Sequence, residues 1–339
     1  MTMLDLHTHV VPARTPFLSR LSSADPRWAR LEPAGETGDV LVAGRAFRTV
    51  RRVAWDLDVR RAAVETSGRT GQLLSAMPEL LAPWAPPDQG LDYARAFNDW
   101  LASEIARHHG FFTGLGIVPL RDPDKAAAVL TEIAESGLLG VEVPSTPPIA
   151  PLHAPAWAGF LDEAERLGLL VFVHAVGGTA AADYPHPMAA NGVVFPANIG
   201  MAVGGLISTG ALATRPNLHI LASHGGGSLM TELPRIDFLR NITPELRELM
   251  PESAAESARR IWFDPLLFDV GLVQHLARVV GTERLVFGTD YPFMPGDPIA
   301  FLDDPVLPTG FAAAVRATNP AMLLDMLTRP DLLAKGIGK

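Results

Sequence analysis

Near its N-terminus the chain reads Leu4-Asp5-Leu6-His7-Thr8-His9, a short apolar strand that ends in two histidines one residue apart. Residues i and i+2 of a strand point to the same face, so His7 and His9 direct two imidazole rings at one point. Imidazole is the commonest metal ligand that side chains supply. Two ordinary histidines at a strand end are the alternative interpretation, and the rest of the chain decides between the two.

Apolar strands and helices alternate along the rest of the chain. Strands are expected at residues 70–76, 112–119, 138–144, 169–174, 218–224, 261–264 and 284–290. Helices are expected at 54–67, 93–108, 124–136, 154–167, 197–212, 228–240, 271–280 and 309–327. Apolar strands that alternate with helices are typical of parallel βα units buried on both faces. Eight of them predict an α/β fold, a closed (β/α)8 TIM barrel rather than an open doubly wound sheet. No Gly-x-Gly-x-x-Gly follows the first strand, which argues against a dinucleotide-binding fold.

Residues 13–50 interrupt this alternation after the first strand. Within an otherwise irregular stretch, residues 39–48 look like a small β-hairpin that turns near Ala43-Gly44. We interpret 13–50 as an insertion that lies over the C-terminal end of the first strand. Barrels of this kind commonly run to about 250 residues or more as one unit, so residues 1–339 are interpreted as a single domain.

Composition excludes several classes of function. The net charge is −9, from 28 basic and 37 acidic residues, and no basic tract is present, so neither nucleic acid nor an anionic membrane is expected as a partner. The chain has no cysteine, which excludes disulfides and thiolate metal sites. No secretory signal pattern and no uninterrupted apolar run of membrane-spanning length is evident. A soluble cytoplasmic protein is therefore expected.

Five polar side chains stand at the ends of four predicted strands. His7 and His9 end the first strand, His174 the fifth, His224 the sixth and Asp290 the eighth. These are C-terminal strand ends, the face on which barrel enzymes build their active sites. Histidines that merely fill a core would not select that one end each time. Three histidines and one carboxylate suit a divalent metal such as zinc, with an open position for a water whose pKa falls from about 15.7 towards about 7.

His224 need not be one of the ligands. From the end of the sixth strand it can contact a metal-bound water and act as a general acid or base. The run Gly225-Gly226-Gly227 that follows it lets the backbone come close to the site.

This arrangement resembles the amidohydrolase superfamily. Its members carry His-x-His on strand one, histidines on strands five and six, and an aspartate on strand eight. Many also carry a carboxylated lysine on strand four that bridges two metals. Here the fourth strand reads Gly140-Val141-Glu142-Val143-Pro144, without a lysine. The resemblance therefore implies a single metal at His7, His9, His174 and Asp290.

Further motifs are similar to those of the aminocarboxymuconate semialdehyde decarboxylase subfamily, over nearly the whole chain. They are Phe47-Arg48, Trp55-Asp56, the run 224–228 followed by Arg235-Ile236-Asp237, and Gly288-Thr289-Asp290-Tyr291-Pro292-Phe293. The resemblance implies that Arg48 binds a substrate carboxylate and that Arg235 does so from the neighbouring subunit of a homodimer. A guanidinium group suits both roles because it can bind a carboxylate through two hydrogen bonds. The alternative for each arginine is a surface ion pair.

One departure from the subfamily falls next to the fifth strand. Its members continue the strand-five histidine with Pro-Trp-Asp, whereas His174 is followed here by Ala175-Val176-Gly177-Gly178. Residues 183–198 also differ. Both segments are expected to line the substrate pocket, so the sequence does not identify the substrate.

The sequence and the resemblance together predict a metal-dependent, non-oxidative decarboxylase, a carbon–carbon lyase that acts on a small unsaturated or aromatic carboxylic acid. One divalent metal is expected, Zn2+ with Mn2+ as the alternative. His224, with Asp290, moves the proton that replaces carbon dioxide, and Arg48 holds a carboxylate. A hydratase or hydrolase that uses the same mononuclear site is the nearest alternative, and a binding protein on an inactive barrel is an alternative of another class.

Overall fold

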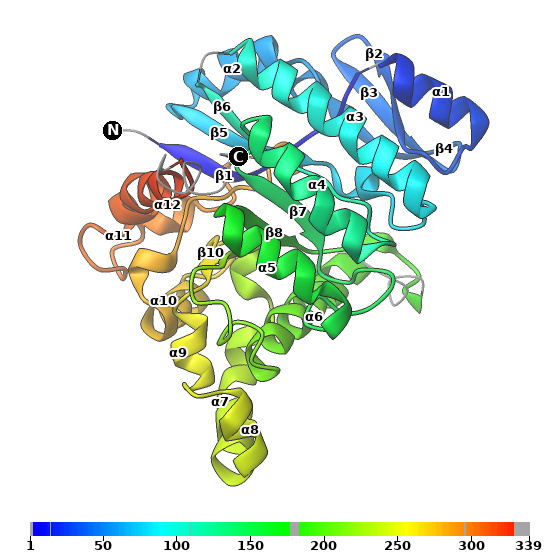
Figure 1. The fold of residues 1–339 in the computed structure, drawn as a ribbon. Helices are drawn as coiled ribbons and strands as arrows, with labels where there is room; N and C mark the ends of the chain where they lie inside the picture. Colours follow the sequence, from blue (N-terminus) through cyan, green and yellow to red (C-terminus); the bar gives the residue numbers. More distant parts are fainter. Residues whose placement is uncertain (1–2, 14, 109, 177–182, 295, 329–339) are drawn as a thin grey trace.

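A curled sheet of seven parallel strands forms the centre of the molecule (Figure 1). The computed structural model describes residues 3–13, 15–108, 110–176, 183–294 and 296–328. Within these residues the strands neighbour one another in the order β1, β5, β6, β7, β8, β9, β10. Their bounds are Leu4–Val10 (β1), Gly71–Ala76 (β5), Phe112–Gly116 (β6), Gly140–Pro144 (β7), Leu170–His174 (β8), His219–Ala222 (β9) and Trp262–Phe263 (β10).

The predicted eighth strand, residues 284–290, closes the sheet without forming a regular strand. It contributes two isolated parallel bridges, Phe263↔Leu285 to β10 and Thr8↔Tyr291 to β1. Backbone hydrogen bonds accompany them, from Leu6 N to Phe287 O (2.8 Å), His9 N to Tyr291 O (2.6 Å) and Val286 N to Phe263 O (2.9 Å). The segment therefore lies between the last and first strands, and the predicted closed (β/α)8 barrel is confirmed.

A buried carboxylate at the start of β1 holds this closing segment. Asp5 accepts hydrogen bonds from the backbone N–H of Thr289 (3.1 Å) and from its hydroxyl (2.6 Å). Asp290, the next residue, has a φ of 56°, which ends the extended backbone at the rim. The backbone N–H of Thr289 thus bonds to a side chain rather than to a strand backbone, and regular ladder pairing is lost at this residue.

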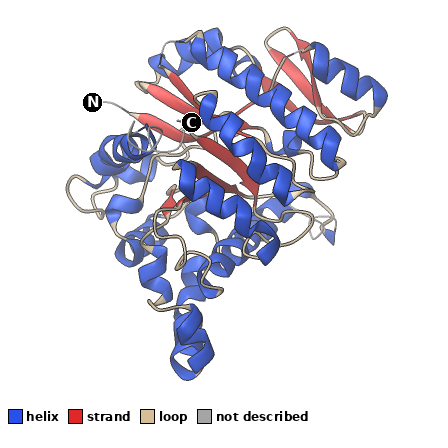
Figure 2. Cartoon of the chain, in the orientation of Figure 1, coloured by secondary structure: helices blue, strands red, loops and turns tan. Residues whose placement is uncertain are grey.

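Helices cover the outside of the barrel (Figure 2). Several begin at an aspartate whose carboxylate accepts a backbone N–H of the first turn, namely Asp56, Asp122 and Asp269. The helix bounds are Leu57–Thr66 (α2), Pro87–Ala106 (α3), Pro123–Glu135 (α4), Ala158–Leu167 (α5), Pro187–Ser208 (α6), Leu229–Ile242 (α7), Pro244–Leu249 (α8), Ala254–Ala258 (α9), Val270–Val280 (α10), Phe311–Ala313 (α11) and Asn319–Thr328 (α12). Short 3-10 turns join them at Arg52–Ala54 (η1), Pro78–Leu81 (η2), Pro155–Trp157 (η3), His224–Gly226 (η5), Thr282–Arg284 (η6) and Ala300–Asp303 (η7), and a π turn spans Ala314–Thr318 (η8).

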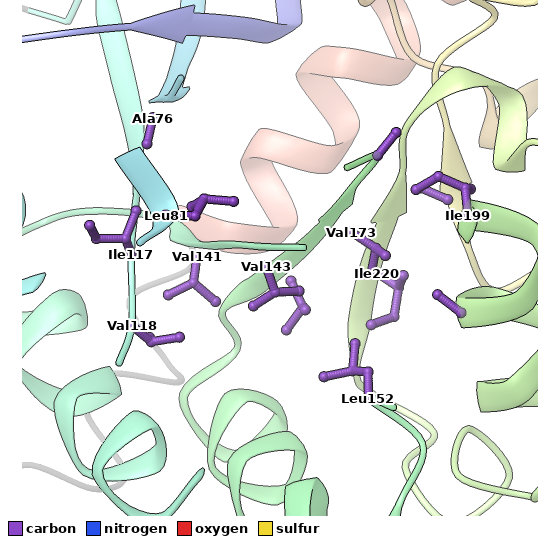
Figure 3. Packing of buried hydrophobic residues seen from close by; sticks show 14 of the residues in the cluster. Ala76, Leu81, Ile117, Val118, Val141, Val143, Leu152, Val173, Ile199 and Ile220 are labelled. Carbon is purple, nitrogen blue, oxygen red and sulfur yellow. The ribbon is translucent and has the colours of Figure 1, made fainter. Parts of the chain in front are cut away.

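The strands separate two apolar layers. On β8, Leu170 and Phe172 belong to an inner cluster that fills the barrel, whereas Val171 and Val173 belong to an outer cluster shared with the helices. Figure 3 shows part of the outer cluster, including Val173 from β8. Strands buried on both faces in this way explain the near-continuous apolar runs of the sequence.

The insertion contains more structure than its sequence suggests. The predicted hairpin is present as β3 (Thr37–Val42) and β4 (Arg45–Arg51), and it turns at Ala43-Gly44, both with positive φ. However, a third antiparallel strand, β2 (Arg30–Ala34), and a helix, α1 (Pro16–Ala24), occupy the stretch that was expected to be irregular. Thr15 caps α1 with its side chain, and Pro16 fixes the first helical residue.

The long helix α6 also differs from expectation, because it begins at Pro187 rather than near residue 197. The side chain of His186 caps it, accepting from Met188 N at 3.1 Å, and the helix continues through Pro196. By length and composition alone, residues Met188–Ser208 could cross a membrane. They lie in the helical layer of the barrel, in contact with α7 and β8, and 56% of their most apolar 18-residue window is buried there, as is usual for a core helix.

Candidate active site

Four buried side chains meet at the C-terminal rim of the barrel. His7 and His9 come from β1, His174 from the end of β8, and Asp290 from the segment that closes the barrel. One ligand atom from each lies within 4.8 Å of those of the others. The two Nε2 atoms of His7 and His174 are 3.1 Å apart, and Asp290 Oδ1 is 3.2 Å from His9 Nε2 and 3.4 Å from His7 Nε2. The fold thus brings together the four residues that the strand ends indicated.

The chemistry of these atoms fits a divalent metal. His9 Nε2 and Asp290 Oδ1 are buried and have no hydrogen-bond partner among the described residues. A buried polar atom without a partner is costly, at about 1–3 kcal/mol. A cation held between them would be a partner for both. Three imidazole nitrogens and one carboxylate oxygen form a donor set that suits zinc or a similar metal. The chain therefore carries a buried His/Asp site suited to a metal.

Oxygen atoms that contact the Nδ1 atoms of His7 and His9 fix the orientation of the two rings. His7 Nδ1 lies 2.8 Å from Asp264 Oδ2, and His9 Nδ1 donates to the carbonyl of Ala76 at 2.7 Å. Each contact leaves the Nε2 atom directed at the centre of the cluster. Sequence reasoning gave Asp264 no role. The sequence did point to Asp264, since this residue ends the predicted seventh strand at the same rim as the cluster of four.

His224 lies beside the four residues but is not one of them. Its ring centroid is 5.2 Å from that of His7 and 5.9 Å from that of His174. A tight turn places it there, with positive φ at His224 and at the three glycines that follow. Asp264 holds the turn, because its carboxylate accepts the backbone N–H groups of His224 (3.0 Å) and Gly225 (3.3 Å).

Burial and neighbouring charges shift the pKa values of the titrating groups of the site in different directions. Burial lowers the pKa values of His9, His174 and His224, so these rings are neutral near pH 7. Burial alone would raise the pKa of Asp290, but the neighbouring rings of His7 and His9 hold it well below its usual range. Burial also opposes the charge of His7, yet Asp264 and Asp290 raise its pKa to about 10. A metal that binds here would therefore displace the proton of His7.

Arg48 reaches the site from the insertion. Its Cζ atom lies 4.2 Å from the ring centroid of Phe293, and that ring stacks on His9 with a centroid distance of 5.2 Å. An ion pair links its Nη2 to Oε1 of Glu79, which is 7% exposed, while Arg48 is 30% exposed. Arg48 Nε, which is buried, and Glu79 Oε2 have no hydrogen-bond partner in the described part of the chain. Arg48 is thus in an ion pair, but one at the rim rather than on open surface.

The remaining predicted residues lie elsewhere. Arg235 is exposed on α7, outside the cluster of four. Ala175 is buried and Val176 accepts a hydrogen bond from Asn198 (2.7 Å), whereas Gly177 and Gly178 lie outside the described residues.

Besides Asp264, two further buried carboxyl groups near the site have no role predicted from the sequence, Glu79 on η2 and Glu142 on β7. Glu142 Oε1 lies 3.4 Å from His174 Nδ1, and burial raises the pKa of Glu142 well above its usual value. For Glu142 the signal was a charged residue between valines in an apolar strand. Glu79 offered no comparable signal.

Comparisons with known proteins agree with this geometry. The sequence profile of the amidohydrolase family matches residues 4–326. The 2-amino-3-carboxymuconate-6-semialdehyde decarboxylase of Dictyostelium discoideum is 30% identical, over 87% of this chain and 82% of that protein. The gamma-resorcylate decarboxylase of Rhodococcus jostii is 27% identical, over 70% of this chain and 77% of that protein.

Solved structures share the fold. The 5-carboxyvanillate decarboxylase of Sphingomonas paucimobilis superposes with a TM-score of 0.78 at 19% identity, over 95% of this chain and 98% of that one. A dihydroxybenzoic acid decarboxylase of Polaromonas sp. JS666, solved with bound manganese, gives a TM-score of 0.76 at 19% identity, over 98% and 99%. The family match and the 30% identical relative also confirm the resemblance seen in the sequence motifs. The chain belongs to the amidohydrolase superfamily and, within it, to the subfamily of the aminocarboxymuconate semialdehyde decarboxylases.

Proposed function

We propose that this protein is a metal-dependent, non-oxidative decarboxylase, a carboxy-lyase that acts on a small unsaturated or aromatic carboxylic acid. The observation that carries the proposal is the buried cluster of His7, His9, His174 and Asp290 in a chain whose curated relatives are named as decarboxylases. The same cluster would also serve a hydratase or hydrolase. The relatives favour decarboxylation, and no comparison favours the alternative.

In the proposed reaction the bond between a substrate carbon and its carboxylate breaks, and carbon dioxide leaves. The electron pair stays on the carbon, which then takes a proton. A divalent metal held by the four ligands would supply polarisation of a substrate oxygen. Arg48 holds a substrate carboxylate with its guanidinium, and His224, aided by Asp290, carries the proton to the carbon. The burial of the cluster of four keeps bulk water from competing.

A panel of unsaturated and aromatic carboxylic acids, offered to metal-loaded protein, tests this function. We expect carbon dioxide together with a product that has hydrogen in place of one carboxylate. In deuterium oxide one deuterium should appear at that carbon. Water added across a double bond, or hydrolysis without carbon dioxide, would instead favour the alternative reaction.

Finer features of the proposal concern the metal, the assembly and the compartment. We propose Zn2+ as the resident metal because three imidazole nitrogens and a carboxylate suit it, with Mn2+ as the alternative. We further propose a cytoplasmic enzyme with a small carboxylate substrate and without nucleic-acid or membrane partners. Residues 1–339 would form one barrel domain, with the insertion 13–50 over the rim.

A homodimer completes the proposal. The helix α7 carries Arg235 and, close by in sequence, the exposed side chains of Phe238, Leu239 and Ile242. With α8 it projects from the barrel (Figure 1). Exposed apolar side chains on a projecting helix are suited to an interface between subunits. Such an interface would let Arg235 reach a substrate carboxylate in the partner's site.

Replacing Arg48 tests its role as a substrate clamp. Arg48→Lys keeps the charge but loses the planar guanidinium that can form two hydrogen bonds to a carboxylate, so the KM should rise. Arg48→Ala should raise the KM further. Both variants should keep their metal. Removing one partner of a buried ion pair costs about 3–5 kcal/mol, and less here because Arg48 is partly exposed, so Arg48→Ala should also be less stable. Steady-state kinetics, metal analysis and thermal unfolding measure the three effects.

Glu79→Gln is the matched control, because it breaks the same ion pair but keeps the guanidinium. A rise in KM in Glu79→Gln equal to that in Arg48→Ala would mean that the ion pair, not the arginine, shapes the pocket.

Mixing Arg48→Ala with Arg235→Ala protein tests the dimer proposal, since a hybrid has one site with both arginines. No recovery of activity in well-exchanged mixtures would contradict a role for Arg235 across the interface.

A further inference from the structure

Glu142 is a carboxyl group in the middle of an apolar strand. Its neighbours on β7, Val141 and Val143, belong to the outer apolar cluster, where Figure 3 shows both side chains. Successive residues of a strand point to opposite faces, so the side chain of Glu142 enters the barrel. It is completely buried there. A buried carboxyl is costly unless other groups hold it, and an apolar residue would fill the same space at no such cost.

His174, on the adjacent strand, presents a ring nitrogen to this carboxyl. The two strands pair with Glu142 opposite Phe172 and Pro144 opposite His174. Glu142 Oε1 lies 3.4 Å from His174 Nδ1. Both carboxyl oxygens and this ring nitrogen are buried, and none of the three has a hydrogen-bond partner among the residues that the structure places. A ring N–H and a carboxyl oxygen thus face each other, and the hydroxyl of Ser75 is another polar group beside this carboxyl.

The two other histidines of the cluster show the same arrangement in completed form. Behind His7 stands the carboxylate of Asp264, and behind His9 the carbonyl of Ala76, each within 2.8 Å of Nδ1. In all three rings Nε2 is directed at the cluster and Nδ1 at an oxygen. Partners of this kind fix the tautomer and the orientation of a ligating imidazole.

We propose that Glu142 is a positioning residue, which accepts the Nδ1–H of His174 and so keeps the Nε2 lone pair of that ring directed at the metal. The carbonyl oxygen of a carboxyl group accepts whether the group is ionised or neutral, so the role is open to either form. Glu142 is not itself a ligand. It stands on the Nδ1 side of His174, whereas the Nε2 side faces His7 at 3.1 Å.

Metal affinity, measured without substrate, tests this role, so its outcome is independent of whether the enzyme decarboxylates anything. Glu142→Leu fills the space but removes the acceptor, and it should weaken Zn2+ binding by about 10- to 100-fold in a chelator competition. The Zn2+ affinity of Glu142→Gln should stay within about threefold of that of the natural protein, because glutamine keeps a carbonyl oxygen that can accept the hydrogen bond. Co2+ substituted for Zn2+ should show an altered visible spectrum in Glu142→Leu alone. Glu79→Gln, which alters another buried carboxyl at the rim, should leave the affinity unchanged.

Natural affinity and an unchanged Co2+ spectrum in Glu142→Leu would overturn the proposal. So would an equal loss of affinity in both Glu142 variants, because glutamine retains the acceptor. Two ions in the natural protein and one in Glu142→Leu would make Glu142 a ligand instead. Should Glu142→Leu fail to fold, the nitrogen-15 resonances of His174 decide the matter in the natural protein and in Glu142→Gln. Both should report a protonated Nδ1, and an Nε2–H tautomer in the metal-loaded protein would refute the role.

Discussion

Replacing His174 with alanine is expected to remove metal and activity together. The side chain supplies one of four donors in a cluster whose atoms lie within 4.8 Å of one another. The remaining three come from β1 and from the segment beside it, so the variant lacks any ligand from the opposite side of the barrel. Mutation of a residue that only hydrogen-bonds to a metal ligand lowers metal affinity by about 10- to 100-fold, and loss of the ligand itself should lower it further. Metal analysis of the purified variant, with assays at added Zn2+ and Mn2+, measures both effects.

His275→Ala is the matched control for this variant. His275 lies on α10, where Arg278 Nη2 is 2.7 Å from its Nδ1, and it is not part of the cluster of four. It should keep one metal per chain and full turnover. A His174→Ala protein that retained one tightly bound metal would contradict the proposed ligand set. Two tightly bound ions per chain in the natural protein would contradict a mononuclear site.

The cluster of four was predictable because its residues stand at the ends of apolar strands. Strand directions in a βα barrel are uniform, so a polar residue at a C-terminal strand end falls on one known rim. Hydrophobic pattern alone therefore placed His174 beside His7 across 167 residues of chain. Asp264 could have been found by the same rule because it ends a strand, and Glu142 by a different signal, a charged residue within an apolar strand.

Other features depend on contacts that hydrophobic pattern does not encode. The ion pair of Arg48 with Glu79 joins the insertion to a short turn after β5, and no local spacing specifies it. The early start of α6 depends on His186 as a cap, a residue type that is uncommon in that role. Pro196 also argued for a boundary, because proline usually ends a helix. The closing segment lost its strand pairing to the side chain of Asp5, which is again a long-range contact.

Loss of the His224 ring should leave the metal in place and stop turnover. The ring stands beside the cluster, 5.2 Å from His7 between centroids, and its backbone N–H is held by Asp264. A positioned acid or base contributes about 10²–10⁴-fold to rate, so His224→Ala should lose that much in kcat with natural metal content. The residue has a φ of 50°, which alanine tolerates poorly, so His224→Asn is the better-matched variant because asparagine accepts this conformation.

The His224→Asn variant should unfold at a temperature close to that of the natural protein, whereas the positive φ should make His224→Ala less stable. Both variants should bind metal as well as the natural protein does, because neither removes a group from the cluster of four. Asparagine keeps a polar side chain of similar reach but cannot carry a proton near pH 7. A loss of kcat shared by both variants therefore isolates proton transfer from the shape of the turn. Metal-free variants would make His224 a ligand or a support for one. Natural turnover in His224→Asn would mean that the proton reaches the substrate by another route, for which Asp290 is one candidate carrier.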